Sequence, residues 1–215
     1  FSGSAGTAVI TKTEARLWTD GRYFIQAAAQ LKGTTVELMK MGEPGVPEMN
    51  AYIEEVLKEG ETLGFDGRVV SVGEGEGYAA IAGKKNAKVN YQVDLIDEIW
   101  EDRPVLSEEP AFNLDVKYAG ETVASKLARI REEMKEAGTN VHVVSTIDDI
   151  CWTLNIRGND IDFFPLVLSY GIITMDSFEL YIDEKKLDDK LKAKLAKDGV
   201  NLHPYNDIYE DVKKF

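Results

Sequence analysis

The sequence predicts an α/β protein made of two tandem copies of one unit, each a mixed sheet flanked by helices. The first observation is a repeat: segments 8–23 and 171–186 align without gaps at an offset of 163 residues. The second is that each copy has an apolar run, a polar turn and an alternating run, which is the pattern of a β-hairpin. The third is that a helix, a strand and a second helix follow both hairpins.

The elements after each hairpin have the same order. In the first copy we expect a helix ending at Gly33, a strand over 34–41 and a helix over 46–59. In the second we expect a helix ending at Gly199, a strand over 200–205 and a helix over 206–215. Glycine is the usual residue just past the end of a helix. The identical hairpin pairs are Ile10/Ile173, Thr11/Thr174, Leu17/Leu180 and Asp20/Asp183, and Arg22 corresponds to Lys185.

The two copies differ in what precedes the hairpin. The second copy has 50 residues from Glu121 to Gly171, which read as a helix over 121–138, a strand over 141–146 and a helix over 147–155. The first copy has only 7 residues ahead of Ala8. Roughly 43 residues of helix, strand and helix are therefore expected to be missing from the first copy, with their strand in the same sheet as the hairpin.

Segment 101–120 separates the copies. It carries Pro104, Pro110 and several acidic residues with little periodicity, which is typical of a linker. We expect a first domain over 1–102, a linker over 103–118 and a second domain over 119–215.

The composition excludes some partners. The net charge is −13, which argues against a nucleic acid or an anionic membrane as the main partner, because both require a positive surface. No apolar run approaches the ~20 residues of a membrane span, and no secretory signal is recognisable. The single cysteine, Cys151, lies in an apolar stretch, so we expect a buried thiol and a reducing, cytoplasmic compartment.

Most motifs that carry chemistry are absent. The stretch "GEGEGY" (73–78) has the wrong glycine spacing for a nucleotide loop, and we expect a helix to begin after its glycines. The two histidines, His142 and His203, have no second ligand at metal-binding spacing. We therefore assign no catalytic residue, no metal ligand and no cofactor to this chain.

The stretch "WTDGRYF" (18–24) allows two interpretations. In one, Thr19 or Asp20 caps a helix that begins near Arg22, and the stretch is only a turn. That interpretation leaves Arg22 unexplained, because a cation is unfavourable at the positive end of a helix dipole. In the other, Arg22 is held there to bind a carboxylate or a carbonyl group of a ligand.

Several stretches together resemble the Xaa-Pro aminopeptidases, or aminopeptidases P, of the longer, three-domain type. They are "FSGSAGTAVIT", "LWTDGRYFIQAAAQL", "LMKMG", "IDEIWEDRP", "STIDDICWTLNIRGND" and "PLVLSYGIIT". The resemblance implies two creatinase-like N-terminal domains, the first of them truncated at its start, ahead of a "pita-bread" catalytic domain. We expect that third domain to lie outside the sequence considered. In the family it binds two metal ions, commonly manganese, and removes an N-terminal residue that precedes proline.

The resemblance assigns one site residue. Arg22 matches the family's N-terminal-domain arginine in "WTDGR" that contacts substrate, whereas "NIRGND" (155–160) resembles a loop near the active-site mouth in which Arg157 receives no role. The expected parent is a cytoplasmic homo-oligomer acting on peptides with proline in the second position. The alternative is a catalytically inactive, peptidase-like binding module, and a reading frame that continues past Phe215 into metal ligands would distinguish the two.

Overall fold

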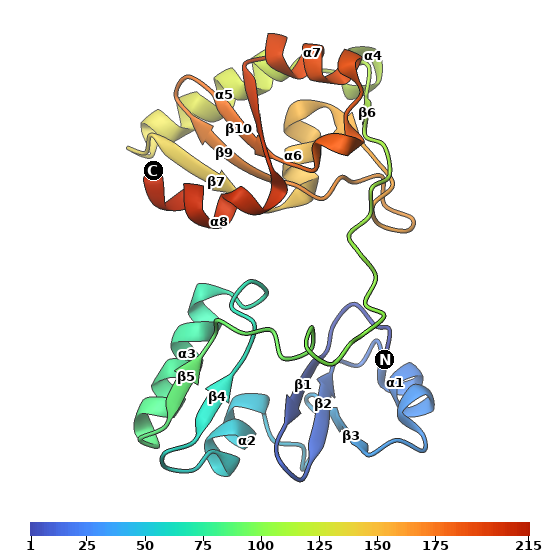
Figure 1. Ribbon diagram of the computed structural model, residues 1–215, viewed down its shortest axis with the longest axis vertical. Helices are drawn as coiled ribbons and strands as arrows, with labels where there is room; N and C mark the ends of the chain where they lie inside the picture. The colour runs from blue at the N-terminus through green and yellow to red at the C-terminus, as the bar shows by residue number, and fades with distance from the viewer. The chain divides into compact units, whose positions relative to one another are not determined.

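Both predicted hairpins form in the computed structural model, which describes residues 1–215 (Figure 1). Strands β1 (Thr7–Ile10) and β2 (Ala15–Thr19) pair antiparallel, as do β9 (Tyr170–Thr174) and β10 (Phe178–Tyr181). Thr7 lies opposite Trp18, and Tyr170 opposite Tyr181, so the two hairpins share one register at the offset of the repeat.

The element after each hairpin also repeats. A helix leads back to a strand that pairs parallel with the second hairpin strand. The elements are α1 (Phe24–Leu31) and β3 (Val36–Lys40) in the first copy, and α7 (Asp189–Lys197) and β11 (Val200–His203) in the second. Gly33 and Gly199 have φ of +83° and +79°, as expected for residues just past a helix end. The predicted duplication is confirmed.

The chain divides into two units, Phe1–Arg103 and Pro104–Phe215. The first unit continues with α2 (Met49–Val56), β4 (Thr62–Gly64), α3 (Val72–Lys84) and β5 (Lys88–Asn90), and β4 pairs parallel with β5. One of its two buried clusters contains Trp18, Met39 and Tyr52, and the other joins α2 to α3 through Ile53, Leu57, Tyr78, Ile81 and Ala82.

The second unit is built on a four-stranded sheet of order β11-β10-β9-β7. Its elements outside the repeat are β6 (Phe112–Asn113), α4 (Val116–Ala119), α5 (Val123–Glu136), β7 (Val141–Val144), α6 (Ile147–Leu154) and β8 (Ile156–Arg157). The second helix of the repeat, expected over 206–215, is the short helix α8 (Ile208–Asp211) between two 3₁₀ turns. Three single 3₁₀ turns are η1 (Glu184–Lys186), η2 (Tyr205–Asp207) and η3 (Val212–Lys214). The predicted helix, strand and helix before the second hairpin are α5, β7 and α6.

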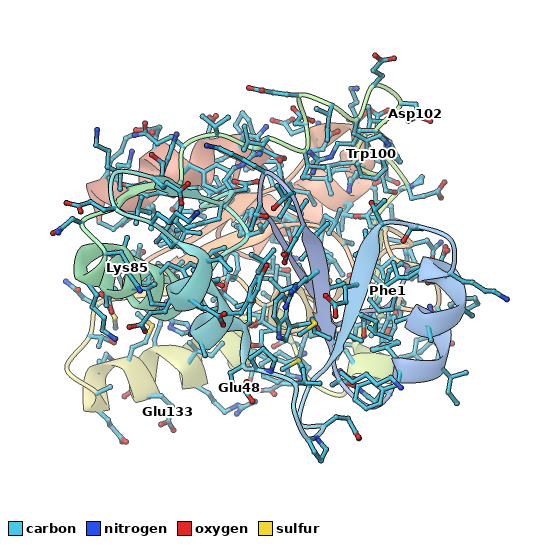
Figure 2. All side chains as sticks on the ribbon, turned by 90° about the horizontal axis from the view of Figure 1, so that it is seen from below. Phe1, Glu48, Lys85, Trp100, Asp102 and Glu133 are labelled. Carbon is cyan, nitrogen blue, oxygen red and sulfur yellow. The ribbon has the colours of Figure 1, made fainter.

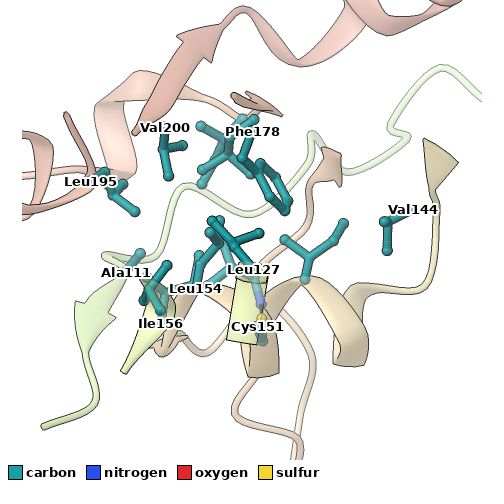
Figure 3. Close-up of a cluster of buried hydrophobic side chains, with 14 of the residues drawn as sticks. Ala111, Leu127, Val144, Cys151, Leu154, Ile156, Phe178, Leu195 and Val200 are labelled. Carbon is teal, nitrogen blue, oxygen red and sulfur yellow. Dashed lines mark hydrogen bonds between the residues drawn. The ribbon is translucent and has the colours of Figure 1, made fainter. Parts of the chain in front are cut away.

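Alternate side chains of this sheet enter two different cores. Ile173, Phe178 and Leu180 pack with side chains of α5, α6 and α7 in the larger cluster (Figure 3). Ile172 and Tyr181, one position along their strands, pack with Ile208 of α8 on the opposite face. The sheet is therefore covered by helices on both faces, as Figure 1 shows.

The start of the second unit includes part of the segment expected as a linker. Ala111 is buried in the larger cluster, and its N–H donates to the carbonyl of Lys186. Phe112 and Asn113 form β6 and pair with β8. The chain from Ala111 onward thus contributes to the fold of this unit.

The outer edge of β1 has no strand beside it in the first unit. In the second unit β7 pairs antiparallel with β9 at the corresponding place, with Val141 opposite Thr174. A cavity of about 890 Å³ lies along β1, lined also by residues of α2 and β4 and by Tyr78. The absence of a strand at this edge agrees with the internal repeat, and the missing helix–strand–helix segment stays a prediction.

The glycine-rich stretch 73–78 is helical, and the expectation that the helix begins after its glycines is wrong. Helix α3 begins at Val72, and Ser71 accepts a hydrogen bond from Glu74 N while the Glu74 carboxylate accepts one from Ser71 N. This capping box fixes the start of the helix, and burial of Tyr78 and Ile81 offsets the low helix propensity of glycine. The longest helix, α5, has 14 residues, and no helix could span a bilayer.

Gly77 provides a test of this description. A methyl group added there would have no heavy atom within 4 Å, and Gly77 does not have a positive φ. We expect Gly77→Ala to raise the free energy of unfolding by about 0.5–1 kcal/mol in urea titrations, because alanine loses less backbone entropy in a helix. Gly33→Ala is the control. Space is equally open at Gly33 but φ is +83°, so the same substitution should destabilise. A loss of stability in Gly77→Ala would contradict the assignment of this stretch to a helix.

Candidate functional site

Arg22 lies in a tight turn between β2 and α1. The N–H of Tyr23 donates to the carbonyl of Asp20 over 3.0 Å, and the N–H of Arg22 donates to Asp20 Oδ1 over 3.0 Å. A short acidic side chain that accepts a hydrogen bond from the backbone two residues on is a common way to fix such a turn. The turn places Arg22 directly after the end of a strand whose last three residues are buried.

The guanidinium of Arg22 makes two parallel hydrogen bonds with Asp20. Nε donates to Oδ1 over 2.9 Å and Nη2 donates to Oδ2 over 2.7 Å. The Arg22 side chain is 66% exposed and that of Asp20 36%. The hydrogen bonds from Arg22 hold the pKa of Asp20 below its usual value, and the same contacts raise the pKa of Arg22. The two groups therefore form a charged pair at neutral pH.

Neither residue expected to cap the following helix does so. Helix α1 begins at Phe24 and has no side-chain cap. The Asp20 carboxylate is engaged by Arg22, and Thr19 Oγ1 donates to the carbonyl of Ala5 over 2.6 Å instead. The capping interpretation of the turn is wrong, because both candidate side chains have other partners.

Residues 1–4 pack against Tyr23, the residue whose ring the Arg22 guanidinium contacts. The guanidinium lies 5.3 Å from the ring centroid of Tyr23, whose hydroxyl hydrogen-bonds Ser4 Oγ. Phe1 packs edge-on against Tyr23, with ring centroids 5.7 Å apart, and Figure 2 labels Phe1 in this part of the first unit. A Cβ at Gly3 would come within 2.9 Å of the Tyr23 ring, so the approach of this segment requires glycine.

The corresponding turn of the second unit keeps the backbone and changes the side chain. Lys185 N donates to Asp183 Oδ1 over 3.0 Å, as Arg22 N does to Asp20. The Lys185 ammonium instead pairs with Glu108, and its side chain is 70% exposed. The duplication has therefore preserved the turn without the arginine–aspartate pair.

A third turn of the same kind escaped the sequence analysis. Arg68 N and Nε donate to Asp66 Oδ1 over 2.9 and 3.1 Å, and Nη2 donates to Oδ2 over 3.0 Å. The signal was available, because the tripeptide Asp-Gly-Arg occurs at both 20–22 and 66–68. Arg68 differs in having a second carboxylate, Asp94, at 3.6 Å. Both Asp-Gly-Arg turns therefore form the same arginine–aspartate pair. Arg22 differs from Arg68 in having no second carboxylate beside it.

Hydrogen bonds and a buried ion pair within the second unit fix the "NIRGND" loop. Arg157 Nη1 donates to the carbonyl of Cys151 over 2.8 Å, which directs this arginine toward the backbone of α6. Asp160 Oδ2 accepts from Lys186 Nζ over 2.5 Å and from Leu168 N over 2.7 Å. Both charged side chains of this ion pair are at most 2% exposed, and Asp160 Oδ1 has no partner.

Beyond this ion pair, the loop projects two aromatic side chains. Phe163 is fully exposed and Phe164 is 59% exposed. Phe163 has a φ of +68°, a conformation that non-glycine residues rarely adopt. Phe164 N donates to the carbonyl of Ile161 over 3.1 Å, closing a turn. An ordered loop that exposes apolar rings is typical of a contact surface.

The residues present do not fit a di-metal centre. No group of three histidine, cysteine, aspartate or glutamate side chains is close enough together to hold an ion. His142 lies exposed on β7, and His203 Nε2 is 2.6 Å from Glu179 Oε2. Cys151 is 1% exposed, and burial raises the pKa of its thiol, so it is a packed side chain rather than an activated nucleophile.

Two family models cover the chain. Residues 1–99 and residues 102–215 each match a model described as the creatinase/prolidase N-terminal domain.

Relatives match over nearly the whole chain. Aminopeptidase P2 of Arabidopsis thaliana is 41% identical over 99% of this chain and 30% of its own length. An Xaa-Pro aminopeptidase of Caenorhabditis elegans is 38% identical over 100% of this chain and 35% of its own length. The crystal structure of X-prolyl aminopeptidase from C. elegans, described as a cytosolic enzyme with a di-nuclear active site, superposes with a TM-score of 0.94 at 37% identity, covering 100% of this chain and 35% of that one. The chain thus spans about a third of the length of these relatives.

The Lys186–Asp160 pair allows a direct test. We expect Lys186→Met to lower the free energy of unfolding by about 3–5 kcal/mol in urea titrations, because it leaves the Asp160 carboxylate buried without a counter-charge. Lys186→Met combined with Asp160→Asn should recover part of the loss, since neither charge then remains. Lys185→Met, at the exposed neighbouring position, is the control and should have little effect. A double variant no more stable than the single one would show that the ion pair is not the cause.

Proposed function

Because this chain belongs to the creatinase/prolidase N-terminal domain family and consists of two consecutive members of it, we propose that it is the non-catalytic N-terminal region of a metal-dependent Xaa-Pro aminopeptidase. The longer protein would release an N-terminal residue that precedes proline. The observation that carries the proposal is the identity of about 40% to such enzymes along nearly the entire chain.

The chemistry would belong to the part of the longer protein outside this chain. We place two divalent metal ions there, with manganese as the expected metal, and the description of the C. elegans enzyme as di-nuclear supports two ions in that relative's active site. No step of the reaction is assigned to a residue described here, because the present histidines and carboxylates form no ligand set.

The two domains would control how a peptide reaches the catalytic domain and would contribute to contacts between copies of the enzyme. Arg22 would bind the substrate peptide, which its exposure and its fixed orientation support. The exposed rings of Phe163 and Phe164 support a contact role for the second domain. A cytoplasmic location is proposed from the single, buried cysteine.

The proposal that the metal ions bind outside this chain predicts the metal content of the isolated chain. We expect a dialysed sample to contain no stoichiometric divalent metal by elemental analysis and to hydrolyse no Xaa-Pro peptide, because it lacks a ligand cluster. The longer protein, dialysed in parallel, should retain metal and activity. Stoichiometric manganese in the isolated chain would contradict the proposal.

The assignment of Arg22 predicts a kinetic effect in the full-length enzyme. Arg22→Ala should lower kcat/KM roughly ten- to hundredfold, because a charge-assisted hydrogen bond to the peptide is lost. The melting temperature should change little, and Arg22→Lys should recover only part of the activity, because an ammonium lacks the planar donor geometry. Lys185→Ala, at the corresponding position of the second domain, is the control. Full activity in Arg22→Ala would refute the assignment.

A further inference from the structure

Two buried lysines hold the two ends of the "NIRGND" loop. Lys126 Nζ donates to Asn155 Oδ1 and to the carbonyl of Trp152, each over 2.7 Å. Lys186 Nζ pairs with Asp160 at the other end of the loop. Lys126 is 1% exposed and Lys186 is 3% exposed, and no other lysine or arginine of the chain is buried. Because a buried cation must be paired or hydrogen-bonded, each lysine fixes the loop residue that it contacts.

The backbone that continues from this loop forms a tip, defined here as residues 161–164. The two sides of the tip are closely packed, since Gly158 N donates to the carbonyl of Pro165 over 3.4 Å. A Cβ at Gly158 would come within 2.7 Å of the Val167 side chain, so the two sides approach too closely for a larger residue. The tip is therefore presented in one fixed conformation.

The tip exposes apolar surface that makes no contribution to the core of the second unit. Phe163 is fully exposed and Phe164 is 59% exposed. The φ of +68° at Phe163 is unfavourable for a residue other than glycine. A fixed loop that holds two rings in water at a strained position is typical of a surface that another structure covers.

We propose that the tip packs against the part of the longer protein that follows Phe215, and so joins the second domain to the remainder of the same polypeptide. The inference rests on the proposed function, in which this chain is one region of a longer enzyme. The chain spans 30% and 35% of two relatives, so most of such an enzyme lies outside it. In the proposed enzyme that remainder continues directly from the unit that carries the tip.

The size of the tip favours a partner within the same polypeptide over a second copy. An aromatic side chain buries about 150–250 Å². Two rings therefore fall short of the roughly 800 Å² per partner that a stable complex of separate proteins buries. Within one polypeptide the covalent connection supplies a high effective concentration, and a small contact is then enough.

The chemistry of the tip also describes the surface that receives it. The two rings require an apolar pocket. Asp162 is exposed beside them and favours a lysine or an arginine at the rim of that pocket.

The first experiment identifies the partner in the full-length enzyme. The photocrosslinker p-benzoylphenylalanine replaces Phe163, and the crosslinked peptides are identified by mass spectrometry after irradiation. We expect a crosslink within one polypeptide, to a residue beyond position 215. A crosslink to a second copy would make the tip an interface between copies and overturn the inference, and so would the absence of any crosslink.

The second experiment measures whether the rings stabilise the longer protein. The variant combines Phe163→Asn with Phe164→Ser, because asparagine tolerates a positive φ and the substitution adds no backbone strain. We expect the melting temperature of the longer protein to fall by at least about 3 °C and that of the isolated 215-residue chain to change by less than about 1 °C. Tyr118→Ser, at a ring that is 72% exposed on α4, is the control and should change neither.

The other outcomes count against the inference. An equal fall in the isolated chain would show that the rings act within the second unit. No fall in the longer protein would show that they stay exposed, and an equal fall in Tyr118→Ser would show that the effect is not specific to the tip. Hydrolysis of an Xaa-Pro peptide by the unmodified longer protein tests the proposed function separately, so an active enzyme without the crosslink would refute this inference alone.

Discussion

The rest of both units depends on the pairing of the second hairpin strand, β2 or β10, which has an antiparallel neighbour on one side and a parallel neighbour on the other. Strand β2 pairs antiparallel with β1 and parallel with β3, and β10 pairs in the same two ways with β9 and β11. An antiparallel neighbour can be reached through a tight turn, whereas a parallel neighbour requires a crossover, here α1 or α7. The chain must therefore leave the end of each central strand and begin a helix within a few residues, and Arg22 or Lys185 lies in that short connection.

The repeat is the reason that much of the fold could be predicted from the sequence. Alternation along 8–19 and 171–181 indicates hairpins, and the gap-free alignment predicts the register that both hairpins share in the structure. The prediction at 73–78 was wrong because the glycines there have low helix propensity, whereas the capping box of Ser71 and Glu74 starts the helix ahead of them. The low helix propensity of these glycines is outweighed by the capping box at the start of α3 and by burial of the helix face that carries Tyr78 and Ile81.

The candidate site was predicted in part. The sequence predicted the position of Arg22 in a turn but not its pairing with Asp20. The spacing of the two residues does not show whether the Asp20 carboxylate accepts hydrogen bonds from the Arg22 guanidinium or caps the helix. The Lys186–Asp160 pair joins residues 26 positions apart in two different loops, and its burial depends on packing that no local pattern contains. Long-range polar pairs of this kind become visible only in the folded chain.

The uncovered edge of β1 has a consequence for the behaviour of this chain in solution. A row of unpaired backbone N–H and C=O groups is a template for another strand, and Ile10 adds an exposed apolar side chain beside it. No bulge or proline interrupts β1, and the net charge of −13 on each chain is the feature of the sequence that opposes the approach of two such edges. Because salt shortens the range of that repulsion, we expect any pairing between copies of this chain to occur at β1 and to increase with ionic strength.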